Sequence, residues 1–129
     1  MSGTGTNGAE GGKGFDTLAQ AIPKEVAAKL GDRSYDKRKQ AALELEAVVK
    51  DLTAENDDEK VRVILAMLDR DFVGSTSPNY RKGGLLGLAT CALGIADMEK
   101  YLDLLIMPAL KCFEDPEPRV RYYACESMY

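Results

Sequence analysis

The chain has 129 residues, 45% of them hydrophobic and 29% charged, with a net charge of −4 and no histidine. Without histidine, the chain cannot form a Ser-His-Asp triad, a Cys-His catalytic pair or a His-ligated zinc site. The acidic balance argues against nucleic acid as the main partner. Three cysteines with no CxxC spacing argue against a closed disulfide framework.

The N-terminal segment 1–14 holds six of the twelve glycines and almost no apolar side chain. We therefore expect residues 1–14 to be a disordered, glycine-rich tail and residues 15–129 to form the folded part. The longest uncharged run covers positions 83–96. A membrane span needs about 20 apolar residues, so this shorter run is typical of a buried helix instead.

Beyond the tail, apolar residues recur with the 3.6-residue period of an amphipathic helix, as in Val61, Ile64, Leu65 and Leu68. No stretch alternates for long enough to indicate a strand. Ser77 followed by Pro78 is typical of a helix start. Breaks at glycine and proline divide the chain into six predicted helices, in three antiparallel pairs: 17–30, 36–53, 57–73, 78–96, 98–113 and 117–129.

The three predicted pairs resemble one another. Leu30, Phe72 and Phe113 each end the first helix of a pair, at nearly equal separations along the chain. A small residue follows each of them by 12, 12 and 11 positions: Ala42, Gly84 and Ala124. A two-helix unit that recurs about every 40 residues is the signature of HEAT or armadillo-type repeats. The sequence therefore predicts an all-α solenoid of about three helix pairs.

Three glycines lie within the fourth predicted helix, at Gly83, Gly84 and Gly87. Each costs about 1 kcal/mol of helix propensity relative to alanine, so we expect them where two helices cross closely. A phosphate-binding loop is excluded, because the GxxxxGK[ST] pattern is absent.

The second helix of each pair opens with basic residues. The candidate protein-contact strip consists of Lys39, Arg81, Lys82, Arg119, Arg121 and Tyr122. Two interpretations remain open: a structural ladder that pairs the basic residues with Asp32, Asp36 and Asp115, or a docking strip for an acidic partner or a phosphoinositide-bearing membrane. In the docking interpretation, reversing the charge of Arg81 and Arg121 weakens partner binding and leaves the helices intact.

The sequence offers no catalytic, cofactor-binding or metal-binding residues. Adjacent carboxylates such as Asp57 and Asp58 diverge around a helix turn, as on a solvated face. The cysteines, Cys91, Cys112 and Cys125, lie near apolar residues and are predicted to be small core side chains.

Four segments resemble the Vac-fourteen family in order and spacing. They are YDKRKQAALELE from Tyr35, RKGGLLGLA from Arg81, CFED from Cys112 and RYYACESMY from Arg121. The resemblance extends over roughly residues 22–129. It implies HEAT repeats and a non-enzymatic scaffold that needs no cofactor. The implied partners are a PIKfyve-type phosphatidylinositol 3-phosphate 5-kinase and a Sac-domain phosphoinositide phosphatase.

The resemblance further implies a peripheral location on the cytoplasmic face of endosome and vacuole membranes, where such complexes make and turn over phosphatidylinositol 3,5-bisphosphate. It assigns kinase contact to the N-terminal repeats, and self-assembly and phosphatase contact to a C-terminal region. Because the family is several times longer, we expect the chain to be an N-terminal region truncated at its C-terminus. The alternative function is a generic HEAT-repeat transport adaptor, which depends on the repeat period alone.

Overall fold

The structure is a computed structural model that describes residues 21–128, and within that range it contains helices and no strands. The predicted tail and the first residues of the predicted helix 17–30 lie outside the described residues. The elements, in chain order, are α2 (Lys24–Leu30), α3 (Tyr35–Ala54), α4 (Asp58–Met67), the π-helical turn η1 (Leu68–Val73), α5 (Pro78–Gly94), the 3-10 turn η2 (Met98–Tyr101), α6 (Leu102–Lys111), the 3-10 turn η3 (Cys112–Glu114) and α7 (Pro118–Ser127).

The helix ends follow local chemistry. Within the described residues, α2 begins after Pro23, which has no N–H to continue a helix towards the N-terminus. The predicted start at Ser77 is confirmed, because its hydroxyl accepts a long hydrogen bond of 3.5 Å from the Tyr80 N–H and Pro78 is the first helical residue. The Asp57 carboxylate caps α4 by accepting from the Lys60 N–H at 3.2 Å. α5 ends earlier than predicted, because Ile95 is extended.

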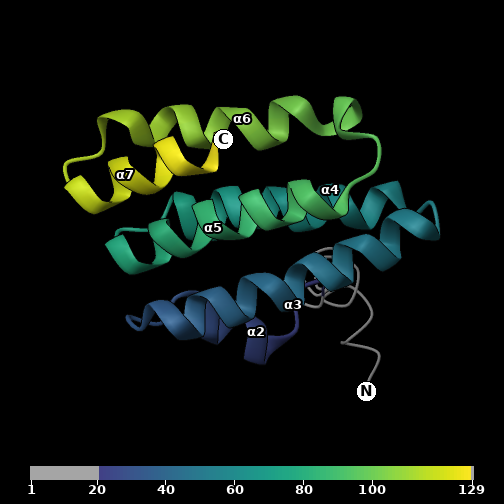
Figure 1. Cartoon of the computed structure of the whole chain (residues 1–129), viewed down its shortest axis with the longest axis horizontal. Helices are drawn as coiled ribbons and strands as arrows, with labels where there is room; N and C mark the ends of the chain where they lie inside the picture. Colours follow the sequence, from purple (N-terminus) through teal and green to yellow (C-terminus); the bar gives the residue numbers. More distant parts are fainter. Residues whose placement is uncertain (1–20, 129) are drawn as a thin grey trace, which may run out of the picture.

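The three pairs stack in chain order, with α2 and α3 at one end, α4 and α5 in the middle and α6 and α7 at the other end (Figure 1). This arrangement confirms the predicted all-α solenoid. Each pair contributes fully buried side chains to one continuous core, among them Leu30, Leu45, Leu65, Leu85 and Val120.

The predicted alignment of the repeats is wrong by one position in two places. Leu30 and Phe113 each precede the arginine of the following turn, Arg38 or Arg121, by eight positions, so their equivalent in the middle pair is the buried Val73 and not Phe72. In the first pair, the small residue that corresponds to Gly84 is Ala41 and not Ala42, because each follows a repeat-equivalent arginine by three positions. The error arises because both neighbours in each case are apolar, so hydrophobicity alone does not distinguish them.

The glycines of α5 lie where other helices approach its backbone. A Cβ atom on Gly83 would overlap the Leu30 carbonyl oxygen of α2. A Cβ atom on Gly84 would meet the Phe72 Cβ at 2.8 Å. The prediction that these small residues permit a close helix crossing is confirmed.

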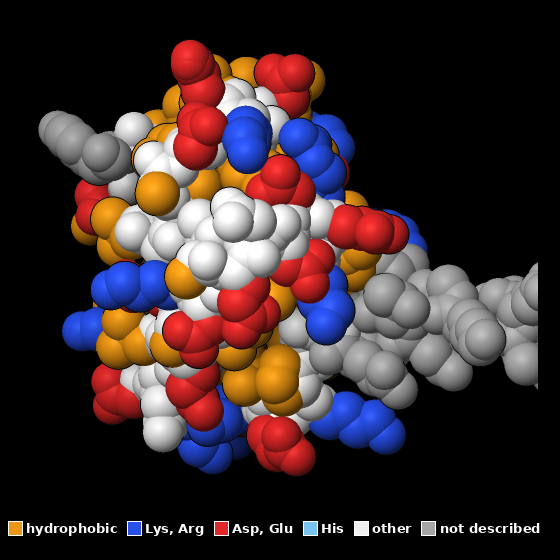
Figure 2. All heavy atoms as spheres, turned by 90° about the vertical axis from the view of Figure 1, so that its right-hand side faces the viewer, with side chains coloured by type: hydrophobic (Ala, Val, Ile, Leu, Met, Phe, Trp, Pro, Cys, Tyr) orange, Lys and Arg blue, Asp and Glu red, His pale blue; other side chains and the backbone are white. Residues whose placement is uncertain are grey.

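One side edge of the stack, which includes the first turn of α4 and the 3-10 turn η2, carries acidic and basic side chains intermixed (Figure 2). There the Tyr101 hydroxyl donates to Asp58 at 2.7 Å, and the Lys100 ammonium lies 3.3 Å from the same carboxylate. The Tyr101 hydrogen bond is the main cause that lowers the pKa of Asp58. Burial, and to a smaller extent the hydrogen bond to the Asp58 carboxylate, raises the pKa of Tyr101 to about 12. These contacts join the middle pair to the last.

Candidate protein-binding surface

The turn that precedes each second helix has the same geometry in all three pairs. A side-chain oxygen accepts from the backbone N–H two residues later: Asp32 from Ser34 at 2.8 Å, Ser75 from Ser77 at 3.0 Å, and Asp115 from Glu117 at 2.9 Å. Aspartate and serine favour such turns because their short side chains reach the backbone. The recurrence shows that these three positions are equivalent in the repeats.

An arginine six residues after each of these positions donates back to its carbonyl oxygen. The distances are 2.9 Å from Arg38 to Asp32, 3.1 Å from Arg81 to Ser75 and 2.6 Å from Arg121 to Asp115. Arg38, Arg81 and Arg121 are therefore the repeat-equivalent basic residues. Lys39 corresponds to Lys82, one position further along.

Arg81 also joins the middle pair to the last. Its guanidinium makes a bidentate ion pair with the Asp115 carboxylate, with N–O distances of 2.7 and 3.0 Å. The two side chains are only 14% and 7% exposed. This ion pair is a contact of the kind that the structural interpretation expects, because Arg81 of one helix pair binds Asp115 of the next. Asp32 instead faces Lys37 of its own pair at 3.9 Å.

The ion pair gives Asp115 an unusual acidity. Burial raises the pKa of this carboxyl, but hydrogen bonds from Arg81 and the Glu117 N–H outweigh burial and hold the pKa below its ordinary value. A depressed pKa means that the ionised carboxylate stabilises the folded chain.

We therefore expect acid to weaken the wild-type chain more than an Asp115→Asn variant. The stabilisation by Asp115 is complete above the unfolded-state pKa of about 4 and is lost as the pH falls through the lower folded-state value. Urea unfolding at several pH values between about 2 and 6 measures the difference. The other acidic groups are common to both proteins, so parallel pH profiles would contradict the role of Asp115.

The remaining residues of the candidate strip lie on the surface around the ends of α3, α5 and α7. Lys39, Arg119 and Arg121 are exposed, Tyr122 is 62% exposed and Lys82 is half-buried. Burial, with Arg38 and Arg119 nearby, lowers the pKa of Lys82. The structure thus divides the strip into one arginine engaged in an ion pair, Arg81, and a group of accessible cations.

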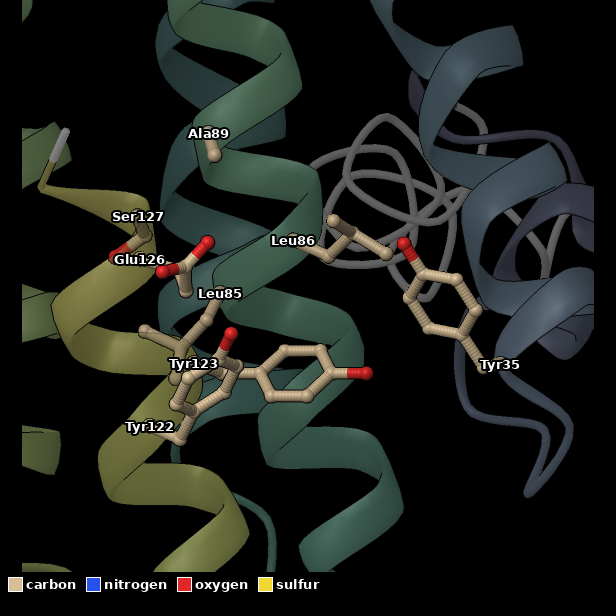
Figure 3. A pocket seen from close by; sticks show the side chains of 8 residues that line it. All are labelled: Tyr35, Leu85, Leu86, Ala89, Tyr122, Tyr123, Glu126 and Ser127. Carbon is tan, nitrogen blue, oxygen red and sulfur yellow. The ribbon is translucent and has the colours of Figure 1, made fainter.

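An open groove of about 420 Å³ runs between α3, α5 and α7 (Figure 3). Its walls are mainly apolar and aromatic, with Glu126 and Ser127 at one side, and Tyr35 of α3 lies across from the α7 residues Tyr122 and Tyr123. The Lys82 Nζ lies 6.0 Å from the centroid of the Tyr123 ring. The groove was not predicted from the sequence, and the predicted strip lacks Tyr35, Arg38 and Tyr123. The one signal in the sequence that could have marked Arg38 is its six-residue spacing from Asp32, which Asp115 and Arg121 repeat.

The cysteines divide into two classes. Cys91 and Cys112 are buried as predicted, and burial is the first cause that raises the pKa of each thiol. Cys125 is exposed, so its prediction as a core residue is wrong: it lies on the outer side of α7, next to the buried Ala124. Among residues 21–128, no three Cys, Asp or Glu side chains gather closely enough to hold a metal ion.

The sequence of the chain is similar to that of a known protein family. Residues 79–129, which include nearly all of α5 and the elements up to α7, match the family described as the Vacuolar 14 Fab1-binding region. A protein named "Protein VAC14 homolog" from Arabidopsis thaliana is 46% identical over 110 residues, covering 84% of this chain and 15% of the relative. The chain belongs to the Vac-fourteen (VAC14) family.

Two fungal relatives agree with this assignment. The "Protein VAC14 homolog" of Schizosaccharomyces pombe is 44% identical over 103 residues, which is 78% of this chain and 13% of the relative. The "Vacuole morphology and inheritance protein 14" of Saccharomyces cerevisiae is 45% identical over 111 residues, 84% of this chain and 13% of the relative. The chain thus spans about one seventh of the length of these relatives. No solved structure matches it.

Proposed function

We propose that this chain is part of a non-enzymatic scaffold that binds a Fab1/PIKfyve-type phosphatidylinositol 3-phosphate 5-kinase. The observation that carries the proposal is the match of α5 to α7 to a family named for Fab1 binding. The fold is compatible with this role, because stacked repeats expose a long continuous surface that suits protein partners. Two of the three helices that form the groove, α5 and α7, lie in the matched region.

The proposal extends to the complex that such a scaffold organises. A Sac-domain phosphatase and further copies of the scaffold would join the kinase, and together they would control the synthesis and turnover of phosphatidylinositol 3,5-bisphosphate. The complex would act on endosome and vacuole membranes, and the scaffold would reach them through its partners. Each helix between residues 21 and 128 is too short or too polar to cross a bilayer.

Co-precipitation from the native cell tests the scaffold function. We expect the tagged full chain, as the cell expresses it, to recover the Fab1/PIKfyve-type kinase of the same organism. Deleting its gene should lower phosphatidylinositol 3,5-bisphosphate, measured by lipid chromatography after metabolic labelling. Absence of the kinase from the precipitate, together with an unchanged lipid level in the deletion strain, would refute the proposal.

A further inference from the structure

The first and middle pairs differ in how their equivalent arginines are neutralised. Arg81 has the carboxylate of Asp115 from the following pair. Arg38 is its equivalent in the first pair, but the acid position of the following pair is Ser75. Arg38 is only 3% exposed, and its Nε has no hydrogen-bond partner among the described residues. A buried guanidinium without a carboxylate is costly unless another group compensates its charge.

Arg38 turns instead towards the groove. Its NH2 group donates to the Tyr123 hydroxyl at 3.0 Å, and its guanidinium carbon lies 5.9 and 5.7 Å from the ring centroids of Tyr35 and Tyr123. Both tyrosines line the groove. Because the Tyr123 oxygen accepts from Arg38, its own O–H remains available to donate to a further acceptor.

The charge around this hydroxyl is predominantly positive. Arg38 on α3 donates to it, and the Lys82 Nζ on α5 lies 6.0 Å from the centroid of the Tyr123 ring. Arg119 on α7 acts on Lys82, and Lys82 and Arg119 make no ion pair within residues 21–128. Two acids face the same region: Glu117 acts on Lys82 from the turn before α7, and Glu126 lines the groove one turn of α7 beyond Tyr123. Three cations against two carboxylates leave this region with a net positive charge, which favours an anionic partner.

The groove walls indicate what carries that charge. Leu85, Leu86 and Ala89 line one side, between the tyrosines of α3 and α7 (Figure 3). A concave, apolar and aromatic wall suits a side chain of a polypeptide, and tyrosines are frequent anchors in protein interfaces. A membrane surface would instead favour a protruding cluster of exposed lysines and arginines.

We propose that the groove binds an acidic segment of the kinase, and this inference depends on the function proposed above. An Asp or Glu side chain of the segment accepts from the Tyr123 hydroxyl and the Lys82 ammonium, and a neighbouring apolar side chain packs on Leu85 and Leu86. The bound carboxylate is linked to Arg38 through the Tyr123 hydroxyl. It thereby supplies the negative charge that Arg38 lacks because Ser75, and not an aspartate, occupies the acid position of the following pair.

Ser75→Asp provides the decisive test. The acid at this position is expected to pair with Arg38 as Asp115 pairs with Arg81, since the turn geometry is the same in both pairs. Arg38 then no longer donates a hydrogen bond to the Tyr123 hydroxyl, and its charge is neutralised within the protein. The groove is therefore expected to attract a carboxylate less strongly. We expect a higher melting temperature and an affinity for the intact kinase at least about 10-fold weaker. A loss of binding in a more stable protein is not a consequence of unfolding.

Two further variants and a control complete the experiment. Tyr123→Phe should weaken binding about 5- to 10-fold, and Lys82→Glu by more than about 10-fold. Lys50→Glu, an equal charge reversal at an exposed position near the far end of α3, should leave the affinity unchanged. Affinity is measured by titrating immobilised kinase with the full chain, at low and high salt, because the groove contact should weaken with salt.

The outcomes separate the two proposals. If the wild-type chain does not bind the kinase, the proposed function and this inference fall together. If the wild-type chain binds and the groove variants bind as tightly as Lys50→Glu, only the inference is overturned. Flotation with phosphatidylserine vesicles containing phosphatidylinositol 3-phosphate adds a second check. Vesicle binding that Lys82→Glu abolishes, with kinase affinity unchanged, would assign the groove to a membrane and overturn the inference.

Discussion

Replacing Arg81 with alanine is expected to lower the free energy of unfolding by about 3 kcal/mol. The substitution leaves the Asp115 carboxylate buried without its bidentate partner, and the loss of one member of a buried ion pair costs about this much. It also removes the hydrogen bonds that Arg81 donates to the Ser75 and Thr76 carbonyl oxygens. Urea unfolding followed by circular dichroism measures the change.

Arg121 provides the matched control. It occupies the equivalent repeat position and donates to the Asp115 carbonyl oxygen, but its side chain is exposed. We expect Arg121→Ala to cost less than about 1 kcal/mol, the range for an exposed hydrogen bond or ion pair. In a double-mutant cycle, Arg81→Ala combined with Asp115→Ala should cost less than the sum of the single changes. Additive losses would show that the pair contributes no coupling.

Arg81 is a poor position at which to test the candidate strip for partner binding. Charge reversal at Arg81 places a glutamate against the buried Asp115, so the variant is expected to lose stability as well as any partner contact. A loss of kinase binding in that variant has two causes that binding data alone do not separate. Lys82 and Tyr123 lie at the groove and make no buried ion pair within residues 21–128, so their variants test docking more directly.

The sequence predicted the helices and their pairing well, because amphipathic periodicity and proline, serine and glycine breaks are local signals. It predicted the repeat alignment less well. The polar pattern of an acid followed six residues later by arginine fixes the alignment in the first and third pairs, but Ser75 interrupts it in the middle pair. Hydrophobic residues alone then allowed Phe72 to be aligned in place of Val73.

The groove could not be predicted from local pattern. Its central contact joins Arg38 of the first pair to Tyr123 of the third, 85 positions apart in the chain. Such a contact depends on the curvature of the stack and on the side-chain conformation that Arg38 adopts when its acid is missing. The basic character of the second-helix starts was visible in the sequence, whereas the packed structure was required to separate the enclosed Arg38 and Arg81 from the more accessible cations.

Replacing Gly83 with alanine is expected to destabilise the chain by about 3 kcal/mol or more, although alanine favours helices by about 1 kcal/mol. The new Cβ would overlap the Leu30 carbonyl oxygen, a backbone atom of α2 that cannot move alone. α2 and α5 must therefore separate, and overpacking of this kind costs about 1–3 kcal/mol even where side chains can adjust. Thermal and urea unfolding of the purified chain measure the loss.

Gly87→Ala is the control that shows whether the destabilisation by Gly83→Ala comes from the close approach of α2 and not from the loss of glycine's flexibility. Gly87 lies one helical turn further along α5, where the three atoms nearest to an added Cβ would be the Cδ2 atoms of Leu68, Leu30 and Leu45, at 3.2 to 3.5 Å. These flexible side-chain ends can yield by a few tenths of an ångström, so Gly87→Ala should range from neutral to about 1 kcal/mol more stable. Equal effects of the two substitutions would contradict the helix crossing at Gly83. A large loss of stability in Gly83→Ala alone would show that the contact between α2 and α5 requires a residue without a Cβ atom at position 83.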